Sequence, residues 1–343
     1  MNYLDAHSLS LIFAGLTALS ILLYAILDGY DLGVGLTLPL KNEVWSDTAI
    51  ASIGPFWDAN ETWLVLGVGL LLVAFPAAHS AILQVFYLPA SLLLLGLILR
   101  GVSFDFRAKV HPKNKKHWDI TFVVGSYIAT SMQGFMLGIY IMGLEYTFTS
   151  IVFGIFSALC VTAAYALIGN TWLILKTTGD LQAHAIKNAK RAGVLTFMGI
   201  LSVCLVNPLV NANVFQVWTT APFAYFYAAI PIICFAMFVF GYRALSRLSR
   251  LSGDAKSQAV TSRYDWQPFA MAIIIFVGCF IGLALSFYPF VVPNELTIYE
   301  AASAPESLRI ILIGAVVVIP VIALYSAFVY YAFRGKTQGL KYY

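Results

Sequence analysis

Long runs of apolar residues, separated by short polar segments, repeat along the whole chain. A helix needs about 20 mostly apolar residues to cross the hydrocarbon core of a bilayer, and runs of about this length occur nine times. The predicted spans are Ser8–Leu27, Asp58–Phe75, Ala81–Leu99, Ile120–Met142, Ser150–Leu175, Val194–Val210, Phe223–Tyr242, Pro268–Tyr288 and Leu308–Phe333. The pattern predicts an all-α polytopic membrane protein with about nine transmembrane helices, in a single integral membrane domain over residues 1–343.

The composition excludes a soluble globular protein. Hydrophobic residues make up 60% of the chain and charged residues only 10%, with a mean hydropathy of +0.84. A soluble domain carries about 25% charged residues, which it needs at its surface. The polar segments are too short to form another domain, and we expect no binding to nucleic acid.

Lysine and arginine are distributed very unevenly between the polar segments. If nine spans alternate, 19 of the 20 basic residues fall on one side of the membrane, and only Arg309 falls on the other. Loops rich in Lys and Arg are typical of the cytoplasmic side. We therefore predict that the N-terminus lies outside and the C-terminus inside.

Two aspartates follow the first apolar run, in Leu27-Asp28-Gly29-Tyr30-Asp31-Leu32-Gly33. Glycine favours the end of a helix at this point, but carboxylates are disfavoured near the negative end of the helix dipole. If the helix continued, Asp28 and Asp31 would share one face. Three roles are open for this pair: a cation site, a proton relay or partners for a buried arginine.

A second acidic group begins the second span. Asp58 and Glu61 have the spacing of a capping box, so helix capping is one interpretation. A cap needs one oxygen, however, whereas this segment offers two carboxylates and the amide of Asn60, next to Trp57. Apolar surroundings favour the protonated form of a carboxyl group, as a proton carrier requires. We therefore favour a functional role, with capping in addition.

Two arginines lie where the third span leaves the apolar core. Arg100 follows the run directly and is a candidate counter-charge for Asp28 or Asp58, because isolated charges are costly in a membrane. For Arg107 we expect a side chain that reaches to the interface. No haem-attachment, zinc or phosphate-binding motif occurs, so we predict no metal or cofactor bound by this chain. The residues alone leave open a proton- or cation-coupled secondary transporter, or a structural anchor.

Several segments together resemble one known family. They are Leu27-Asp28-Gly29-Tyr30-Asp31-Leu32-Gly33, Trp57-Asp58-Ala59-Asn60-Glu61-Thr62-Trp63-Leu64, Leu99-Arg100-Gly101 and Thr171-Trp172-Leu173-Ile174-Leu175-Lys176-Thr177. In this order they resemble subunit II of the bacterial cytochrome bd quinol oxidases. Family members usually have Gly at Ala59 and Phe at Tyr30, and both differences are conservative. The short chain is similar to the cyanide-insensitive branch.

The resemblance implies an architecture and a partner. The fold would be two four-helix bundles plus one peripheral helix, in the bacterial inner membrane. The complex would oxidise quinol, reduce dioxygen to water and generate a proton-motive force. Haem b, haem d and the quinol site would belong to a larger subunit I. Small single-span accessory subunits and a structural quinone or lipid are further expected partners.

The resemblance also assigns roles to the two acidic groups. Asp58, and with it Glu61, would line a proton-uptake path from the cytoplasm. A supporting polar cluster would surround this path, formed by Asp28, Asp31, Trp57, Asn60 and Arg100. This chain would otherwise act as a scaffold for the haem-bearing subunit I.

Overall fold

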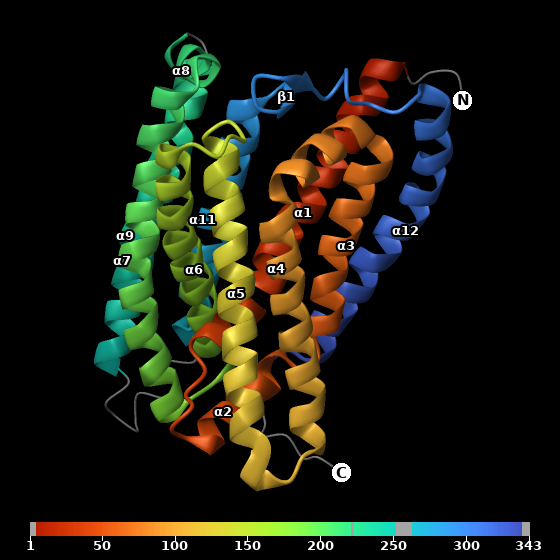
Figure 1. The fold of residues 1–343 in the computed structure, drawn as a ribbon. Coiled ribbons are helices and arrows are strands. Elements are labelled where there is room, and N and C mark those ends of the chain that lie inside the picture. The colour runs from red at the N-terminus through yellow and green to blue at the C-terminus, as the bar shows by residue number, and fades with distance from the viewer. Residues whose placement is uncertain (1–4, 221–222, 252–262, 338–343) are drawn as a thin grey trace.

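The computed structural model describes residues 5–220, 223–251 and 263–337 (Figure 1). The helices are α1 (Ala6–Leu36), α2 (Glu43–Ile53), α3 (Trp57–Ala74), α4 (Pro76–Lys109), η1 (Pro112–Asn114), α5 (Lys115–Ile141), α6 (Phe148–Lys176), α7 (Gly179–Val210), α8 (Ala212–Thr219), α9 (Phe223–Leu251), α11 (Trp266–Phe287) and α12 (Pro305–Ala332). Two short antiparallel strands, β1 (Phe290–Val292) and β2 (Leu296–Thr297), lie between α11 and α12.

The long helices account for the predicted spans. Among the described residues, eight helices are long and apolar enough to cross a membrane. A ninth span results if α2 and α3, which meet at an angle of 51°, count as one bent unit. The prediction of about nine transmembrane helices is therefore confirmed.

These helices form two bundles and one peripheral helix. The first bundle contains α1, α3, α4 and α5, and the second contains α6, α7, α9 and α11. Packing of both α5 and α1 against α6 joins the two bundles, while α12 lies at one edge beside α1 and α3 (Figure 1). The bundle architecture expected from the family resemblance is confirmed.

The end predicted for the first span is wrong. Helix α1 continues beyond Leu27 to Leu36, so both aspartates lie inside it. The glycines permit close helix contact here instead of ending the helix. A Cβ atom on Gly33 would lie 1.8 Å from the backbone oxygen of Tyr165, and one on Gly169 would lie 2.3 Å from the backbone of Gly33. Small residues allow membrane helices to approach this closely.

Several helices continue beyond their apolar runs into the charged segments. Helix α7 begins at Gly179, well before the predicted span at Val194, and α4 continues to Lys109. Apolar length alone misses these extensions because helical turns outside the hydrocarbon core can be polar. The predicted boundaries of these spans therefore do not coincide with the ends of the helices.

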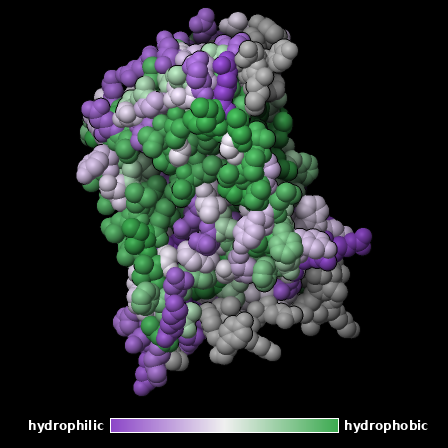
Figure 2. Space-filling view, turned by 90° about the vertical axis from the view of Figure 1, so that its right-hand side faces the viewer, coloured by the Kyte–Doolittle hydropathy of each residue, from purple (hydrophilic) through white to green (hydrophobic). Residues whose placement is uncertain are grey.

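The basic segments gather at one end of the molecule, which we call the basic end. It contains the segments that follow α1, α4 and α6, the last turns of α9, and the described residues after α12 (Figure 1). Lys256 and Lys341 lie outside the described residues. Figure 2 shows a broad apolar band between two more hydrophilic ends, with a small hydrophilic patch inside the band. This distribution fits a protein embedded in a bilayer.

Candidate functional site

A buried arginine is the centre of the candidate site. The side chain of Arg100, on α4, is 1% exposed. Its Nη1 atom lies 2.6 Å from Oδ1 of Asp28 on α1, whose side chain is fully buried. Its Nη2 atom forms an ion pair with Glu61 on α3. The expected pairing of Arg100 with Asp28 is thus present, and Glu61, not Asp58, is the second partner.

Close packing of α4 against α5 positions this arginine. A Cβ atom on Gly96 would lie 2.8 Å from the backbone of both Gly125 and Ala129, and one on Gly125 would lie 2.9 Å from the backbone nitrogen of Arg100. The absence of side chains lets the two helices meet one turn before Arg100. The guanidinium group is therefore directed between α1 and α3 from a rigid helix contact.

Asn60 is the centre of a second group of polar side chains, which includes Asp31. Its Nδ2 atom donates to Oδ2 of Asp31 at 2.8 Å and lies 2.9 Å from the hydroxyl of Tyr30. The hydroxyl of Tyr330, on α12, donates to Oδ1 of Asn60 at 3.1 Å and lies 2.6 Å from that of Tyr30. These bonds join α1, α3 and the peripheral helix α12.

The cluster contains more acid than base. Asp28 and Glu61 pair with the buried cation Arg100, whereas the buried Asp31 has no ion pair among the described residues. Oδ2 of Asp28 and Oδ1 of Asp31 are buried and have no hydrogen-bond partner among the described residues. An unpaired buried carboxylate is strongly disfavoured relative to its protonated form. The arrangement can therefore hold at least one proton on its carboxyl groups.

A further polar group lies one helical turn from Asp28. Nε2 of Gln133 donates to the hydroxyl of Tyr24 at 3.0 Å, and the hydroxyl of Tyr165 donates to Oε1 of Gln133 at 2.5 Å. The sequence analysis missed these residues and Tyr330. Gln133 had a usable signal, since it is the only side-chain amide in its predicted span. The tyrosines had none, because aromatic residues are abundant in this chain.

Asp58 lies apart from the buried cluster. It is exposed in the first turn of α3 and forms no ion pair among the described residues. The predicted capping box is wrong, because the N-cap residue is Phe56 and no side chain caps this helix. Trp57 packs beside α4, with its ring centroid 4.9 Å from that of Phe104. Asp58 is thus free of a structural role as a cap.

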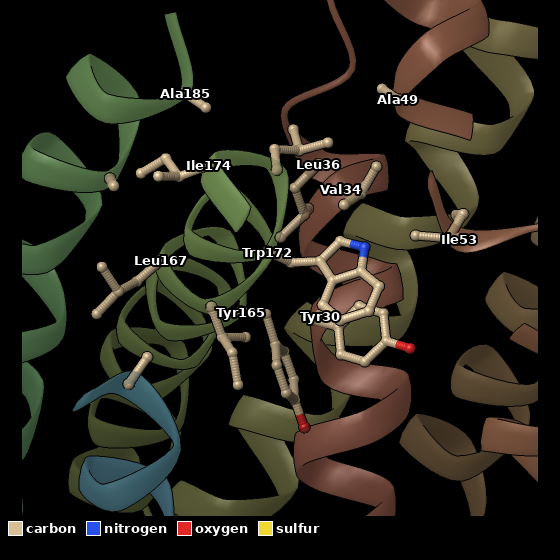
Figure 3. Packing of buried hydrophobic residues seen from close by; sticks show 14 of the residues in the cluster. Tyr30, Val34, Leu36, Ala49, Ile53, Tyr165, Leu167, Trp172, Ile174 and Ala185 are labelled. Atoms are coloured by element: carbon tan, nitrogen blue, oxygen red, sulfur yellow. The ribbon is translucent and has the colours of Figure 1, made fainter. Parts of the chain in front are cut away.

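Aromatic rings pack against the basic-end side of the cluster. The ring of Tyr30 stacks on Trp172 of α6 with centroids 4.2 Å apart, as seen in Figure 3. The ring of Phe56 stacks on Tyr330 at 4.7 Å and meets Trp172 edge to face. This layer surrounds the hydroxyl groups of Tyr30 and Tyr330 with apolar surface, which strengthens their hydrogen bonds to Asn60.

Arg107 is also buried, contrary to the prediction that it reaches to the interface. Its Nη2 atom lies 2.7 Å from Oδ1 of Asp47 on α2, and its Nε atom lies 2.5 Å from Oδ1 of Asp119 on α5. The two carboxylates come from α2 and α5, and no local pattern in the sequence indicates this pairing. The arginine joins α2, α4 and α5 at the basic end and is separate from the candidate site.

The histidines do not provide a haem site within the bundles. His111, His117 and His184 are exposed at the basic end, while His7 and His79 lie at the opposite end. The ring of His7 stacks on Tyr299 with centroids 4.2 Å apart. Among the described residues, no group of three or more His, Cys, Asp or Glu side chains is arranged to hold a metal ion. All five histidines therefore lie at the two ends of the bundles and not in their interior.

Comparisons with known proteins identify relatives over almost the whole chain. The family model for cytochrome bd terminal oxidase subunit II matches residues 9–333. The chain is 29% identical over 336 residues to cytochrome bd ubiquinol oxidase subunit 2 of Bacillus subtilis, covering 91% of this chain and 92% of the relative. It is 24% identical to cytochrome bd-I ubiquinol oxidase subunit 2 of Escherichia coli, covering 97% and 96%.

A solved structure has the same fold. A chain of the bd oxidase from Geobacillus thermodenitrificans superimposes with a TM-score of 0.74, covering 95% of this chain and 99% of that one. The sequence identity is 16%, so this comparison shows only that the helices are arranged in the same way.

Proposed function

The chain belongs to the cytochrome bd terminal oxidase subunit II family, and from this premise we propose that it works in a complex that oxidises quinol and reduces dioxygen to water. The observation that carries the proposal is the family match over residues 9–333. It makes this chain a multi-pass subunit of an oxidoreductase in the bacterial inner membrane. A secondary transporter is not favoured, because the one bent helix pair, α2 and α3, has no counterpart among the described residues.

The positions of the histidines in this chain support a division of labour within the complex. Haem b and haem d, which would supply the electron transfer and oxygen chemistry, belong in this proposal to a subunit I partner. The exposed or terminal positions of the histidines support this assignment. The present chain then contributes a scaffold and polar side chains, and no electron carrier.

We place the proton entry at Asp58. This carboxylate is exposed on the first turn of α3, and Glu61 follows three residues later on the same helix face. The side chain of Glu61 is 28% exposed and contacts the buried Arg100. A proton can therefore pass from water to Asp58, then to Glu61, and so reach the acid-rich cluster. Arg100 would hold Glu61 and Asp28 in place without itself losing a proton.

The direction of uptake depends on which side the basic end faces. We propose that it faces the cytoplasm, because the basic residues of short loops gather there. Protons consumed in oxygen reduction would then come from the cytoplasm. Uptake on this side contributes to the proton-motive force when quinol protons leave on the other.

Purification from the native membrane tests the oxidase assignment. We expect haem b and haem d absorption bands and a larger chain that co-purifies with this one. A colourless protein without a partner, from membranes that retain those bands elsewhere, would contradict the proposal.

Replacing Asp58 with Asn tests the proton entry. The amide keeps the size of the side chain but cannot carry a proton. In assembled complex with full haem content, we expect quinol oxidase turnover to fall by about 10²-fold or more. The matched control is Asp180→Asn, an exposed carboxylate in the first turn of α7 at the same end. Full turnover in Asp58→Asn would remove Asp58 from the path.

A further inference from the structure

A groove on the second bundle has no place in the proposed chemistry. It lies between α7 and α9, with α6 and α11 as its floor, and encloses about 370 Å³. Pockets that hold small ligands usually measure about 300–1,000 Å³. Its walls are largely apolar, with Phe197 on α7, Phe235 and Phe238 on α9, and Met271 and Ile275 on α11.

Two glycines keep this groove open. Gly193 on α7 and Gly241 on α9 both line it. A Cβ atom on Gly193 would meet only the side chain of Leu167, at 3.8 Å, and one on Gly241 only that of Met271, also at 3.8 Å. These positions differ from Gly33, where helix packing excludes any side chain. Here a larger residue would fit into the groove and fill it.

Among the residues that the structure describes, the only charged ones that line the groove are basic. They are Lys190 on α7 and Arg243 on α9, and neither forms an ion pair among the described residues. The Nζ atom of Lys190 lies 5.8 Å from the ring centroid of Tyr242, which also lines the groove. Two cations beside an apolar groove, without an acidic partner in the described part of the chain, are complementary to a ligand with an anionic head and an apolar tail.

The depth of the two cations matches the level of lipid headgroups. Lys190 precedes the apolar run that begins at Val194 by one helical turn, and Arg243 directly follows the run that ends at Tyr242. Both therefore lie at the boundary of the hydrocarbon core, at the basic end. Basic pockets between transmembrane helices at this level are suited to anionic lipid headgroups.

We propose that this groove is a binding site for one anionic phospholipid. An acyl chain occupies the apolar part between α7 and α9, and Lys190 and Arg243 bind the phosphate. A quinone suits the site less well, because its neutral headgroup has no charge for the two cations to neutralise. The site is distinct from the proton path, because no lining residue belongs to the Asp28–Arg100–Glu61 cluster.

Lipid retention by the whole complex tests this proposal. The complex is purified in detergent, and phosphatidylglycerol or phosphatidylcholine is titrated while bound lipid is counted by native mass spectrometry. For the wild type we expect one tightly bound phosphatidylglycerol in preference to phosphatidylcholine. Lys190→Gln with Arg243→Gln should weaken its binding at least about tenfold, given the contribution of each basic residue near a membrane surface.

The matched control removes the same charge from the same helices outside the groove. Lys187→Gln with Arg250→Gln changes two exposed residues of α7 and α9 that do not line it, and should leave binding unchanged. Gly193→Leu should also abolish retention, by filling the groove while both cations remain. Haem content and turnover report whether each variant has assembled.

Three outcomes would overturn the proposal. The first is equal loss of lipid in the groove variant and in the charge control, which means a general surface effect. The second is equal binding of phosphatidylcholine. The third is unchanged retention in Gly193→Leu, which places the lipid elsewhere.

Discussion

The two bundles treat their charged residues in opposite ways. In the first bundle, Arg100 is buried together with Asp28 and Glu61 between α1, α3 and α4. In the second, Lys190 and Arg243 stay at the rim of an apolar groove and have no acidic partner among the described residues. An isolated charge inside a bilayer-spanning bundle is costly, and the buried Arg100 is paired with two carboxylates. The buried charges of the first bundle are suited to moving protons, and the two cations at the rim of the groove in the second bundle are suited to binding lipid.

Removing Arg100, the shared cation of the first bundle, should cause the largest loss of stability. Arg100→Met leaves Asp28 and Glu61 without their partner, and breaking a buried ion pair in this way costs about 3–5 kcal/mol. We expect little assembled complex, measured as haem absorbance per amount of this chain in the membrane. Normal assembly would show that the ion pairs do not stabilise the bundle.

The contact between the two bundles should be nearly as sensitive. Gly33→Ala forces a Cβ atom into the backbone of Tyr165 on α6, and overpacking of this kind costs about 1–3 kcal/mol or more. Thermal unfolding of the purified complex measures the loss. Gly15→Ala, on the same helix with no neighbour within 4 Å, is the control and should leave the midpoint unchanged or slightly raised. Equal effects of the two substitutions would contradict the close helix contact.

We expect a smaller loss of stability from a substitution at the contact between α12 and the first bundle. Tyr330→Phe removes the hydroxyl that donates to Asn60 and meets Tyr30, and a hydrogen bond of this kind contributes about 1 kcal/mol. Tyr331→Phe, whose side chain is exposed, should have no effect. The unfolding midpoint distinguishes the two variants, and identical midpoints would mean that these hydroxyls do not hold α12.

The smallest effect on stability should come from the rim of the groove. Lys190→Gln breaks no ion pair with a described residue, so we expect a change within about 0.5 kcal/mol, measured by thermal unfolding in detergent without added lipid. A loss as large as that for Arg100→Met would erase the difference between the two bundles.

The sequence predicts much of this fold because the bilayer imposes it. The lengths of the apolar runs predict where the helices lie. The distribution of Lys and Arg predicts that the basic segments lie at one end of the molecule. The sequence does not locate the end of α1, because glycine is compatible both with a helix end and with close packing. Only the position of α6 beside Gly33 decides between the two.

The candidate site was predictable in part for a similar reason. Charged residues in apolar runs are rare, so Asp28, Glu61 and Arg100 stand out individually. Which of them pair depends on helix rotation, which no local pattern encodes. Of the two alternatives Asp28 and Asp58, Arg100 pairs with Asp28, and Glu61 is a further partner that was not predicted. Arg107 was misjudged for this reason too, since its partners lie on α2 and α5.

The central claim, that protons enter through Asp58 from the basic end, is tested most directly by following protons. The complex is reconstituted into vesicles in one orientation, with a pH indicator on the basic-end side, and is given a pulse of oxygen. We predict uptake from that side in the wild type and in Asp180→Asn, and its loss in Asp58→Asn at equal haem content. Undiminished uptake in Asp58→Asn would contradict the account.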